Sequence, residues 1–150
     1  MSKYQMVIFV CTGNTCRSPM AEVLFKSLQS DNSIQVLSRG LVVLFPEPSN
    51  PKAETVLKSH NLILENHTAT PLMAEDIDDA TLILAMTQSQ KNNIIEDFGH
   101  PENVFTLKGF VGEEGDVTDP YGGDLIDYEN CFAQLARLVK KTVIKINELD

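Results

Sequence analysis

The sequence has no tryptophan, only three cysteines among its 150 residues, and 12 basic residues against 21 acidic ones. Three cysteines do not suit the disulfide framework of a small secreted domain. The formal net charge of -9 argues against nucleic acid as a general partner, since a polyanion requires a basic surface. No apolar run is long enough to span a membrane, and the N-terminus lacks an apolar segment followed by a cleavage site. We therefore expect a cytoplasmic protein that binds neither nucleic acid nor membranes.

The rest of the composition is ordinary for a globular protein, with 43% apolar and 22% charged residues. A chain of 150 residues suits one domain with a single core. Internal repeats, low-complexity tracts and an interdomain linker are not evident. We expect residues 1–150 to form one domain and the protein to be a monomer.

Short apolar runs alternate with segments of helical periodicity. The runs predict strands at residues 6–10, 34–38, 81–86 and 103–107. Helices are predicted over residues 19–28, 51–61, 88–99 and 125–149. Their expected N-terminal caps are Ser18, Asn50 and Thr87, the last with Gln90 in a capping box. Strands that alternate with helices predict an α/β fold of three layers, a four-stranded parallel sheet flanked by helices.

In such folds the functional site lies at the carboxyl ends of the strands. Two segments follow strands there. One is the stretch "VCTGNTCRSPM", in which residues 11–17, here named the anion loop, lead from the first strand into a helix. The other is the long loop of residues 108–124, rich in glycine and aspartate. Connections of that length in a compact domain are often functional.

The anion loop has the residues needed to bind a tetrahedral oxyanion. Backbone N–H groups can curl inward between a strand and a helix N-terminus, which adds partial positive charge. Gly13 permits a conformation that other residues resist, and Asn14 tolerates a left-handed one. Arg17 has a planar fork suited to two phosphate oxygens. A Walker loop is excluded, because no lysine precedes its final serine.

Cys11 stands at the start of this loop. A thiol beside N–H donors, a helix N-terminus and Arg17 should lose its proton readily and attack a bound phosphate in line. The alternatives are an inert buried cysteine and a zinc site. The spacing of Cys11 and Cys16 is wrong for a zinc knuckle and no compact histidine pair accompanies it, so we expect no metal.

Several stretches together resemble the low-molecular-weight protein tyrosine phosphatase family. They are "VCTGNTCRSPMAE", "SRG" at residues 38–40, "LILAM" at 82–86 and "DPYGG" at 119–123. The resemblance covers most of the chain and implies an enzyme without metal or cofactor. It implies a four-stranded parallel sheet flanked by helices, with a phosphate-binding loop after the first strand. The implied partners are phosphorylated proteins.

The resemblance also implies a role for each site residue. Cys11 would be the nucleophile that forms a phosphocysteine, Arg17 the clamp on the phosphoryl oxygens, and Asp119 the general acid and then base. The expected phosphate- and substrate-binding residues are Thr12, Gly13, Asn14, Thr15, Cys16, Ser18 and Tyr121. Ser18 would donate a hydrogen bond to the thiolate. Asn14 would hold the loop with Ser38 and His67, although His67 equally fits a purely structural histidine.

Asp119 has neighbours that could take its place: Asp116, Asp124 and Asp127. The substrate is also open. Thr15 stands where family members that act on tyrosine carry a larger aliphatic residue, and a single aromatic, Tyr121, follows Asp-Pro. Both features resemble the bacterial protein-arginine phosphatases. The physical rationale is that a threonine hydroxyl at the pocket wall can orient a guanidinium, which an aliphatic side chain cannot do. Phosphoarginine is therefore favoured over phosphotyrosine. Alternatives of other classes are an arsenate reductase and a non-catalytic phosphate-binding module.

The remaining cysteines suggest redox sensitivity. Cys16 lies on the same loop as Cys11, so oxidation could form a reversible Cys11–Cys16 disulfide that protects the nucleophile. Cys131 falls on the apolar side of the last helix and is expected in the core. That position argues against arsenate reduction, which requires redox cysteines in a mobile segment.

Overall fold

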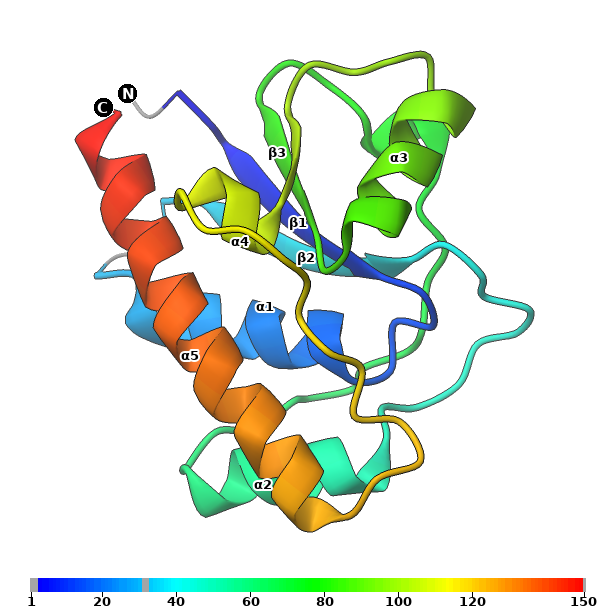
Figure 1. Ribbon diagram of the computed structural model, residues 1–150, viewed down its shortest axis with the longest axis vertical. Coiled ribbons are helices and arrows are strands. Elements are labelled where there is room, and N and C mark those ends of the chain that lie inside the picture. Colours follow the sequence, from blue (N-terminus) through cyan, green and yellow to red (C-terminus); the bar gives the residue numbers. More distant parts are fainter. Residues whose placement is uncertain (1–2, 31–32, 150) are drawn as a thin grey trace.

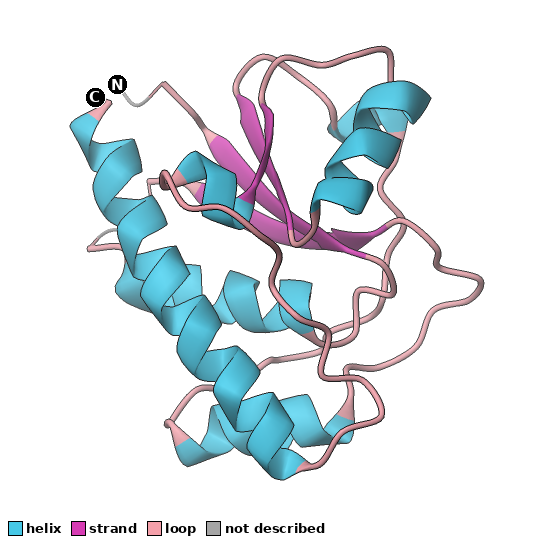
Figure 2. Ribbon diagram, viewed as in Figure 1, coloured by secondary structure: helices cyan, strands magenta, loops and turns pink. Residues whose placement is uncertain are grey.

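A four-stranded parallel sheet lies at the centre of the fold (Figures 1 and 2). The computed structural model describes residues 3–30 and 33–149. The strands are β1 (Met6–Cys11), β2 (Gln35–Gly40), β3 (Thr81–Ala85) and β4 (Val104–Thr106). Their spatial order is β2-β1-β3-β4, and every pairing is parallel. The predicted sheet is confirmed, and β1 is one of its two central strands.

Helices cover both faces of the sheet. They are α1 (Arg17–Leu28), α2 (Pro51–Ser59), α3 (Gln88–Asp97), α4 (Leu107–Phe110) and α5 (Leu125–Glu148), with a 3-10 turn η1 (Ala74–Asp76). α1 and α5 pack against each other on one face, whereas α3 lies on the other (Figure 1). α2 packs against α5. This is the three-layer arrangement that the sequence predicted.

The apolar run of β1 supplies both faces. Val7 and Phe9 belong to the larger core cluster, together with residues of α1 and α5. Ile8 and Val10 belong to a second cluster that includes Ile94 of α3. All four side chains are fully buried. A strand that is covered on both faces has a continuous apolar sequence. The sequence of β1 therefore predicted a strand although apolar and polar residues do not alternate along it.

The start of α1 differs from its prediction. The helix begins at Arg17 after Cys16, which makes no side-chain capping hydrogen bond, so the assignment of Ser18 as the cap was wrong. The Ser18 hydroxyl instead contacts the side chains of Cys11 and Asn14. These tertiary partners replace the backbone N–H that a capping serine would accept. The predicted caps of α2 and α3 are confirmed at Asn50 and at the Thr87–Gln90 capping box.

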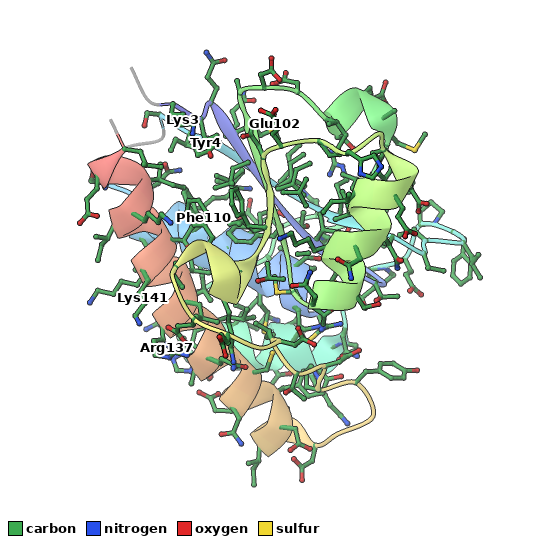
Figure 3. All side chains as sticks on the ribbon, turned by 45° about the horizontal axis from the view of Figure 1, so that its top comes forward. Lys3, Tyr4, Glu102, Phe110, Arg137 and Lys141 are labelled. Atoms are coloured by element: carbon green, nitrogen blue, oxygen red, sulfur yellow. The ribbon has the colours of Figure 1, made fainter. Side chains whose placement is uncertain are left out.

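The predicted loop of residues 108–124 is shorter than expected. Thr106 ends β4, and its hydroxyl accepts a hydrogen bond from the Gly109 N–H, which caps the short helix α4. The irregular segment therefore begins at Val111. Glu113 fastens it to α5 through contacts of 2.6 Å with Arg137 and 2.8 Å with Lys141, two residues that project from neighbouring turns (Figure 3). No helix in the described ranges is long and apolar enough to cross a membrane.

Candidate active site

Cys11 is the last residue of β1 and lies at the carboxyl end of the sheet, where the sequence placed it. Its side chain is 3% exposed. The Sγ atom lies 3.0 Å from Ser18 Oγ, within hydrogen-bonding distance. A hydroxyl in that position can donate to a thiolate, so the contact expected between Ser18 and Cys11 is present.

Asn14 holds the anion loop in shape. It has φ 58°, the left-handed conformation that its residue type was expected to tolerate, and its side chain is completely buried. Its Nδ2 donates to Ser18 Oγ at 2.9 Å, and its Oδ1 accepts from the Thr70 N–H at 2.9 Å. His67 Nε2 donates to the Asn14 carbonyl at 2.6 Å. His67 thus supports the loop and does not enter the pocket.

Two expectations for the loop are wrong. Gly13 does not have a positive φ, and a Cβ placed on it would lie 3.8 Å from its nearest neighbour, Thr15 Oγ1, so its special backbone freedom is not used. Ser38 is buried, but its hydroxyl does not bond to Asn14. It has no hydrogen-bond partner at all among the described residues. Ser18 and Thr70 satisfy the Asn14 side chain instead.

Gly40, at the end of β2, is a structural requirement of the site that the sequence did not reveal. A Cβ on Gly40 would lie 2.6 Å from Val43 Cγ2 and 2.9 Å from the Thr12 carbonyl oxygen. The N–H groups of Leu41 and Val42 donate to that same carbonyl at 2.9 and 3.0 Å. The close approach of β2 and the anion loop therefore excludes any side chain here. The only signal in the sequence was the glycine in "SRG". A sequence does not show that this glycine lies against the Thr12 carbonyl of the anion loop.

Arg17 connects the anion loop to the segment before α5. Its side chain is almost fully buried, and Nη1 donates to the Val117 carbonyl at 2.9 Å. Nη2 lies 3.4 Å from Asp119 Oδ2 in an ion pair. The Asp119 side chain is 51% exposed, and its Oδ1 accepts the Tyr121 N–H. The two charged residues singled out by the sequence thus meet at the anion loop.

The other aspartates of that segment have different partners. Asp116 accepts the N–H of Gln88 at the start of α3. Asp124 and Asp127 form the capping box of α5. Of the four aspartates, Asp119 is the one that pairs with Arg17. The geometry therefore favours Asp119 over the alternatives that the sequence left open.

A cavity of about 230 Å³ opens above Cys11. Its walls are formed by six residues of the anion loop: Cys11, Thr12, Gly13, Thr15, Cys16 and Arg17. Asp119, Tyr121 and Glu47 complete it. We call it the thiol pocket. Of the other expected site residues, Asn14 and Ser18 lie beneath its floor, where they support the loop.

Glu47 was missed by the sequence analysis. It is an exposed residue of the proline-rich segment "FPEPSN", and nothing in its surroundings marks it as functional. The structure brings this residue to the same pocket as Cys11 because its segment bonds to the anion loop, through the Asn50 N–H and the Thr15 carbonyl at 2.8 Å. The pocket is thus lined by a second acidic residue besides Asp119.

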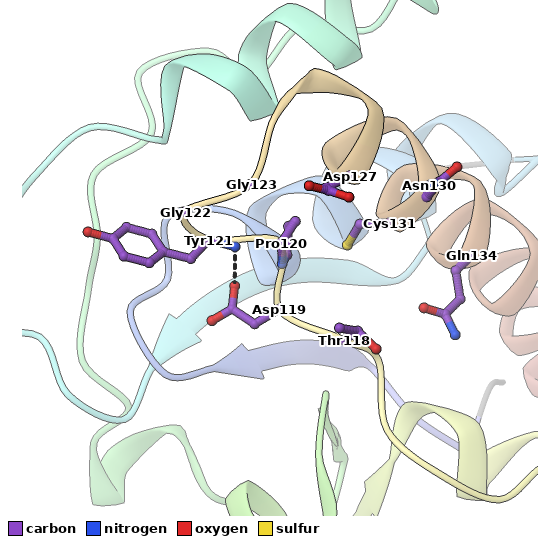
Figure 4. Close-up of a pocket in the computed structure, with 10 residues that line it drawn as sticks. All are labelled: Thr118, Asp119, Pro120, Tyr121, Gly122, Gly123, Asp127, Asn130, Cys131 and Gln134. Carbon is purple, nitrogen blue, oxygen red and sulfur yellow. Dashed lines mark hydrogen bonds between the residues drawn. The ribbon is translucent and has the colours of Figure 1, made fainter.

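Cys131 lies on α5 and is buried, as expected. Its side chain does not only fill the core. It lines a cavity of about 460 Å³ on the other side of the segment that carries Asp119, which we call the rear cavity (Figure 4). It belongs to the same packed cluster of buried side chains as Cys16. A residue of α5 thus packs beside the anion loop, which helical periodicity alone did not predict.

In the described part of the chain, no three His, Cys, Asp or Glu side chains gather as a metal site would require. The site instead has a thiol, backbone amides, a helix N-terminus and a guanidinium around a small pocket, with a carboxylate at its mouth. A parallel α/β fold with this set of groups defines a cysteine-based phosphatase. Proteins of that class hydrolyse phosphate esters or amides by way of a bound phosphoryl group.

Comparison with known proteins assigns the family. The chain belongs to the family described as low molecular weight phosphotyrosine protein phosphatase, whose model matches residues 6–149. It is 44% identical to the protein-arginine-phosphatase of Bacillus subtilis (strain 168), over 90% of this chain and 97% of that protein. It is 37% identical to the low molecular weight protein-tyrosine-phosphatase PtpB of Staphylococcus haemolyticus, over 90% and 95%. As a class, the substrates of this family are phosphorylated proteins.

Solved structures agree with this assignment. A YwlE arginine phosphatase with a phosphorylated active-site serine superposes with a TM-score of 0.89 at 39% identity, covering 95% of this chain and 96% of that one. YwlE arginine phosphatase from Geobacillus stearothermophilus gives 0.88 at 37% identity, covering 95% and 93%. The fold and family expected from the sequence are confirmed.

Proposed function

We propose that this chain, as one domain over residues 1–150, hydrolyses phosphoarginine in proteins, with phosphotyrosine as the alternative substrate. The catalytic residues in this proposal are Cys11, Arg17 and Asp119. The enzyme acts as a cytoplasmic monomer and needs no metal or cofactor. Its net charge of -9 fits a protein partner better than nucleic acid.

Phosphate binding begins with the anion loop. Backbone N–H groups and the N-terminus of α1 receive the phosphoryl oxygens, and Arg17 binds two of them through its planar fork. The bond from Arg17 to the Val117 carbonyl keeps the guanidinium in place while its free edge turns to the substrate. The phosphorus then lies above Cys11 Sγ.

The reaction has two steps. The Cys11 thiolate attacks phosphorus and forms the S–P bond, while the P–N bond to the guanidino group breaks and Asp119 supplies the proton that this nitrogen takes up. Water then attacks the phosphocysteine, and Asp119 accepts its proton. The S–P bond breaks, phosphate leaves, and the thiolate of Cys11 is regenerated. Ser18, 3.0 Å from Sγ, stabilises the thiolate as leaving group.

The substrate preference depends on one observation above all: Thr15 lines the thiol pocket beside Cys11. Its hydroxyl can accept a hydrogen bond from a guanidino N–H, which an aliphatic residue cannot do. The two acidic residues that line the same pocket, Glu47 and Asp119, favour a cationic side chain. Tyr121, 80% exposed, offers one aromatic wall, which can stack on a guanidinium plane or on an aryl ring.

The test compares phosphate release from a phosphoarginine peptide and a phosphotyrosine peptide of the same sequence. The wild type should prefer phosphoarginine. Cys11→Ser should be inactive because it lacks the nucleophile. It should still bind inorganic phosphate, because the backbone N–H groups of the anion loop and Arg17 remain. Thr15→Ile should shift the ratio of kcat/KM values towards phosphotyrosine by about tenfold, the effect of one polar contact.

Thr55→Ile provides the matched control, since Thr55 is an exposed residue of α2 outside the thiol pocket. This variant should leave the ratio unchanged. Glu47→Gln should lower kcat/KM for phosphoarginine more than for phosphotyrosine. A wild type that releases phosphate from phosphotyrosine only would make the tyrosine alternative correct.

A further inference from the structure

All three cysteines of the chain are buried at or beside the anion loop. Cys11 ends β1, Cys16 precedes the first residue of α1, and Cys131 lies in the second turn of α5. They are 3%, 7% and 5% exposed and belong to the same packed cluster. All three are free thiols. The mechanism above uses only Cys11, so the positions of Cys16 and Cys131 call for an explanation.

Cys16 and Cys131 lie in one packed cluster of buried side chains, on the face of the sheet where α1 and α5 pack against each other. The hydrogen bond with Cys131 and burial raise the pKa of Cys16. The hydrogen bond with Cys16, together with the positive charge of Arg17, lowers the pKa of Cys131 against the opposing effects of burial and Asp119. Of the two thiols, Cys131 is therefore the more readily ionised.

The two thiols open onto different cavities. Cys16 lines the thiol pocket with Cys11. Cys131 lines the rear cavity, whose other walls include Asp119, Pro120 and Gln134 (Figure 4). Asp119 and Tyr121 border both cavities, so the segment that carries them is the partition. Cys16 and Cys131 thus lie at two cavities that this segment separates.

We propose that Cys131 is a resolving thiol, which takes an oxidised active site back to its thiolate by moving the disulfide from Cys11–Cys16 to Cys16–Cys131. The proposal rests on the proposed function only in taking Cys11 as the reactive thiol of the thiol pocket. It assigns Cys131 to redox recovery and not to phosphate hydrolysis.

The chemistry balances with a peroxide as the oxidant. The Cys11 thiolate attacks the peroxide O–O bond, which leaves Cys11 as a sulfenic acid and releases the other oxygen as an alcohol or water. The Cys16 thiol then attacks this sulfur, and water leaves as the Cys11–Cys16 disulfide forms. The Cys131 thiolate attacks Cys16 Sγ, the Cys16–Cys131 bond forms, and Cys11 leaves as a thiolate. Overall, one peroxide is reduced while Cys16 and Cys131 are oxidised.

The positions of the three sulfurs suit this order. Cys16 shares the thiol pocket with Cys11 and a packed cluster with Cys131, so it is the central sulfur in both disulfides. The final disulfide borders the rear cavity, where a small thiol can reduce it without entering the thiol pocket. A molecule in which Cys16 and Cys131 are joined in a disulfide would thus keep Cys11 as a reduced thiolate.

Mass spectrometry tests the transfer directly. Trypsin cuts after Lys3 and Arg17, so Cys11 and Cys16 fall in one peptide, residues 4–17. Cleavage after Lys108 and Arg137 places Cys131 in another, residues 109–137. After one equivalent of hydrogen peroxide and alkylation, we expect a cross-linked pair of these peptides, with Cys11 alkylated and Cys16 in the bridge. A Cys11–Cys16 disulfide within residues 4–17 that accumulates in place of the cross-link would overturn the proposal.

Activity provides the second readout. Wild type treated with one equivalent of peroxide should regain phosphatase activity without added thiol. Cys131→Ser should recover more slowly by about tenfold or more until dithiothreitol is added. Reduced Cys131→Ser should match the wild type in kcat, and Cys131→Ala provides a second variant if serine perturbs the core. Equal recovery of wild type and both variants would contradict a resolving role.

These results are independent of the substrate. A wild type that hydrolyses no phosphopeptide but forms the cross-link would refute the proposed function and support the transfer. One that hydrolyses phosphoarginine but never forms the cross-link would do the reverse.

Discussion

Arg17 Nη2 lies 3.4 Å from Asp119 Oδ2, so the expected clamp and the expected acid are joined by an ion pair. The same guanidinium donates through Nη1 to the Val117 carbonyl. One side chain thereby fixes the position of the segment that carries Asp119 relative to the anion loop. Since Asp119 is half exposed and Arg17 is buried, the carboxylate is the partner that can move when substrate enters.

Asp119→Asn should lower kcat on a phosphoarginine peptide by roughly 10²–10⁴, the range for loss of a general acid–base group. Asparagine keeps the size of the side chain but cannot transfer the proton. Asp124→Ala is the control, because Asp124 caps α5 and does not pair with Arg17. It should cost about 0.5–2 kcal/mol of unfolding free energy with kcat retained. Unchanged turnover in Asp119→Asn would assign the acid to another residue.

Asn14→Ala should destabilise the protein by about 1–3 kcal/mol, because it leaves the Thr70 N–H without its buried acceptor. It should also lower kcat/KM, since the anion loop loses its central support. Asn61→Ala is a close match: Asn61 also has a left-handed backbone, with φ 60°, but is exposed. Urea denaturation of both variants separates the cost of the backbone from that of the buried amide. Equal losses would show that the amide bonds are unimportant.

Gly40→Ala and Gly13→Ala should differ sharply in stability. A methyl group on Gly40 meets Val43 and the Thr12 carbonyl, and relieving such overlap typically costs about 1–3 kcal/mol. A methyl group on Gly13 finds its nearest neighbour at 3.8 Å and should cost much less. The comparison uses chemical denaturation of the two variants beside the wild type. A less stable Gly13→Ala would contradict the packing described here.

Glu113 should contribute to stability only where it is ionised. Hydrogen bonds from Arg137 and Lys141 lower its pKa to about 2 from the usual 4.5. Since the folded value is the lower one, the contribution is complete above about pH 4.5 and is lost as the pH falls towards 2. Glu113→Gln should therefore lower the thermal midpoint slightly at neutral pH, as expected for a surface ion pair, and by clearly less at pH 2, where half of the folded molecules have lost this charge.

Salt gives an independent check on Glu113. About 1 M sodium chloride should reduce the difference between Glu113→Gln and the wild type, because exposed charges are screened. Glu114→Gln removes the next carboxylate, which makes no ion pair within the described residues, and should change the midpoint little. A deficit of Glu113→Gln that is as large at pH 2 as at neutral pH would show that charge is not its cause.

Local signals explain most of what the sequence predicted. The run of residues 6–10 and the Thr87–Gln90 capping box depend on neighbours within a few positions, and both were found. The motif of Cys11 and Arg17 also lies within one short loop, so its existence needed no tertiary information. Asp119 came from the family resemblance, and the structure adds the ion pair that distinguishes it from the aspartates beside it.

The errors arose where distant segments meet. Ser18 obeyed the local rule for a helix cap, but Cys11 and Asn14 bind its hydroxyl instead. Gly40 and Glu47 act through contacts with an anion loop some thirty positions earlier, which periodicity cannot register. Cys16 and Cys131 enter the same buried cluster through the packing of α5 on α1.

The segment after β2 fastens the anion loop from outside, through the N–H groups of Leu41, Asn50 and Thr70 and the ring of His67. For protein engineers, grafting residues 11–17 alone onto another strand–helix junction would transfer the reactive groups without their scaffold. The smallest transplantable unit extends to Leu72, whose N–H bonds to the Gly40 carbonyl. Roughly the first half of the chain would have to move as one cassette.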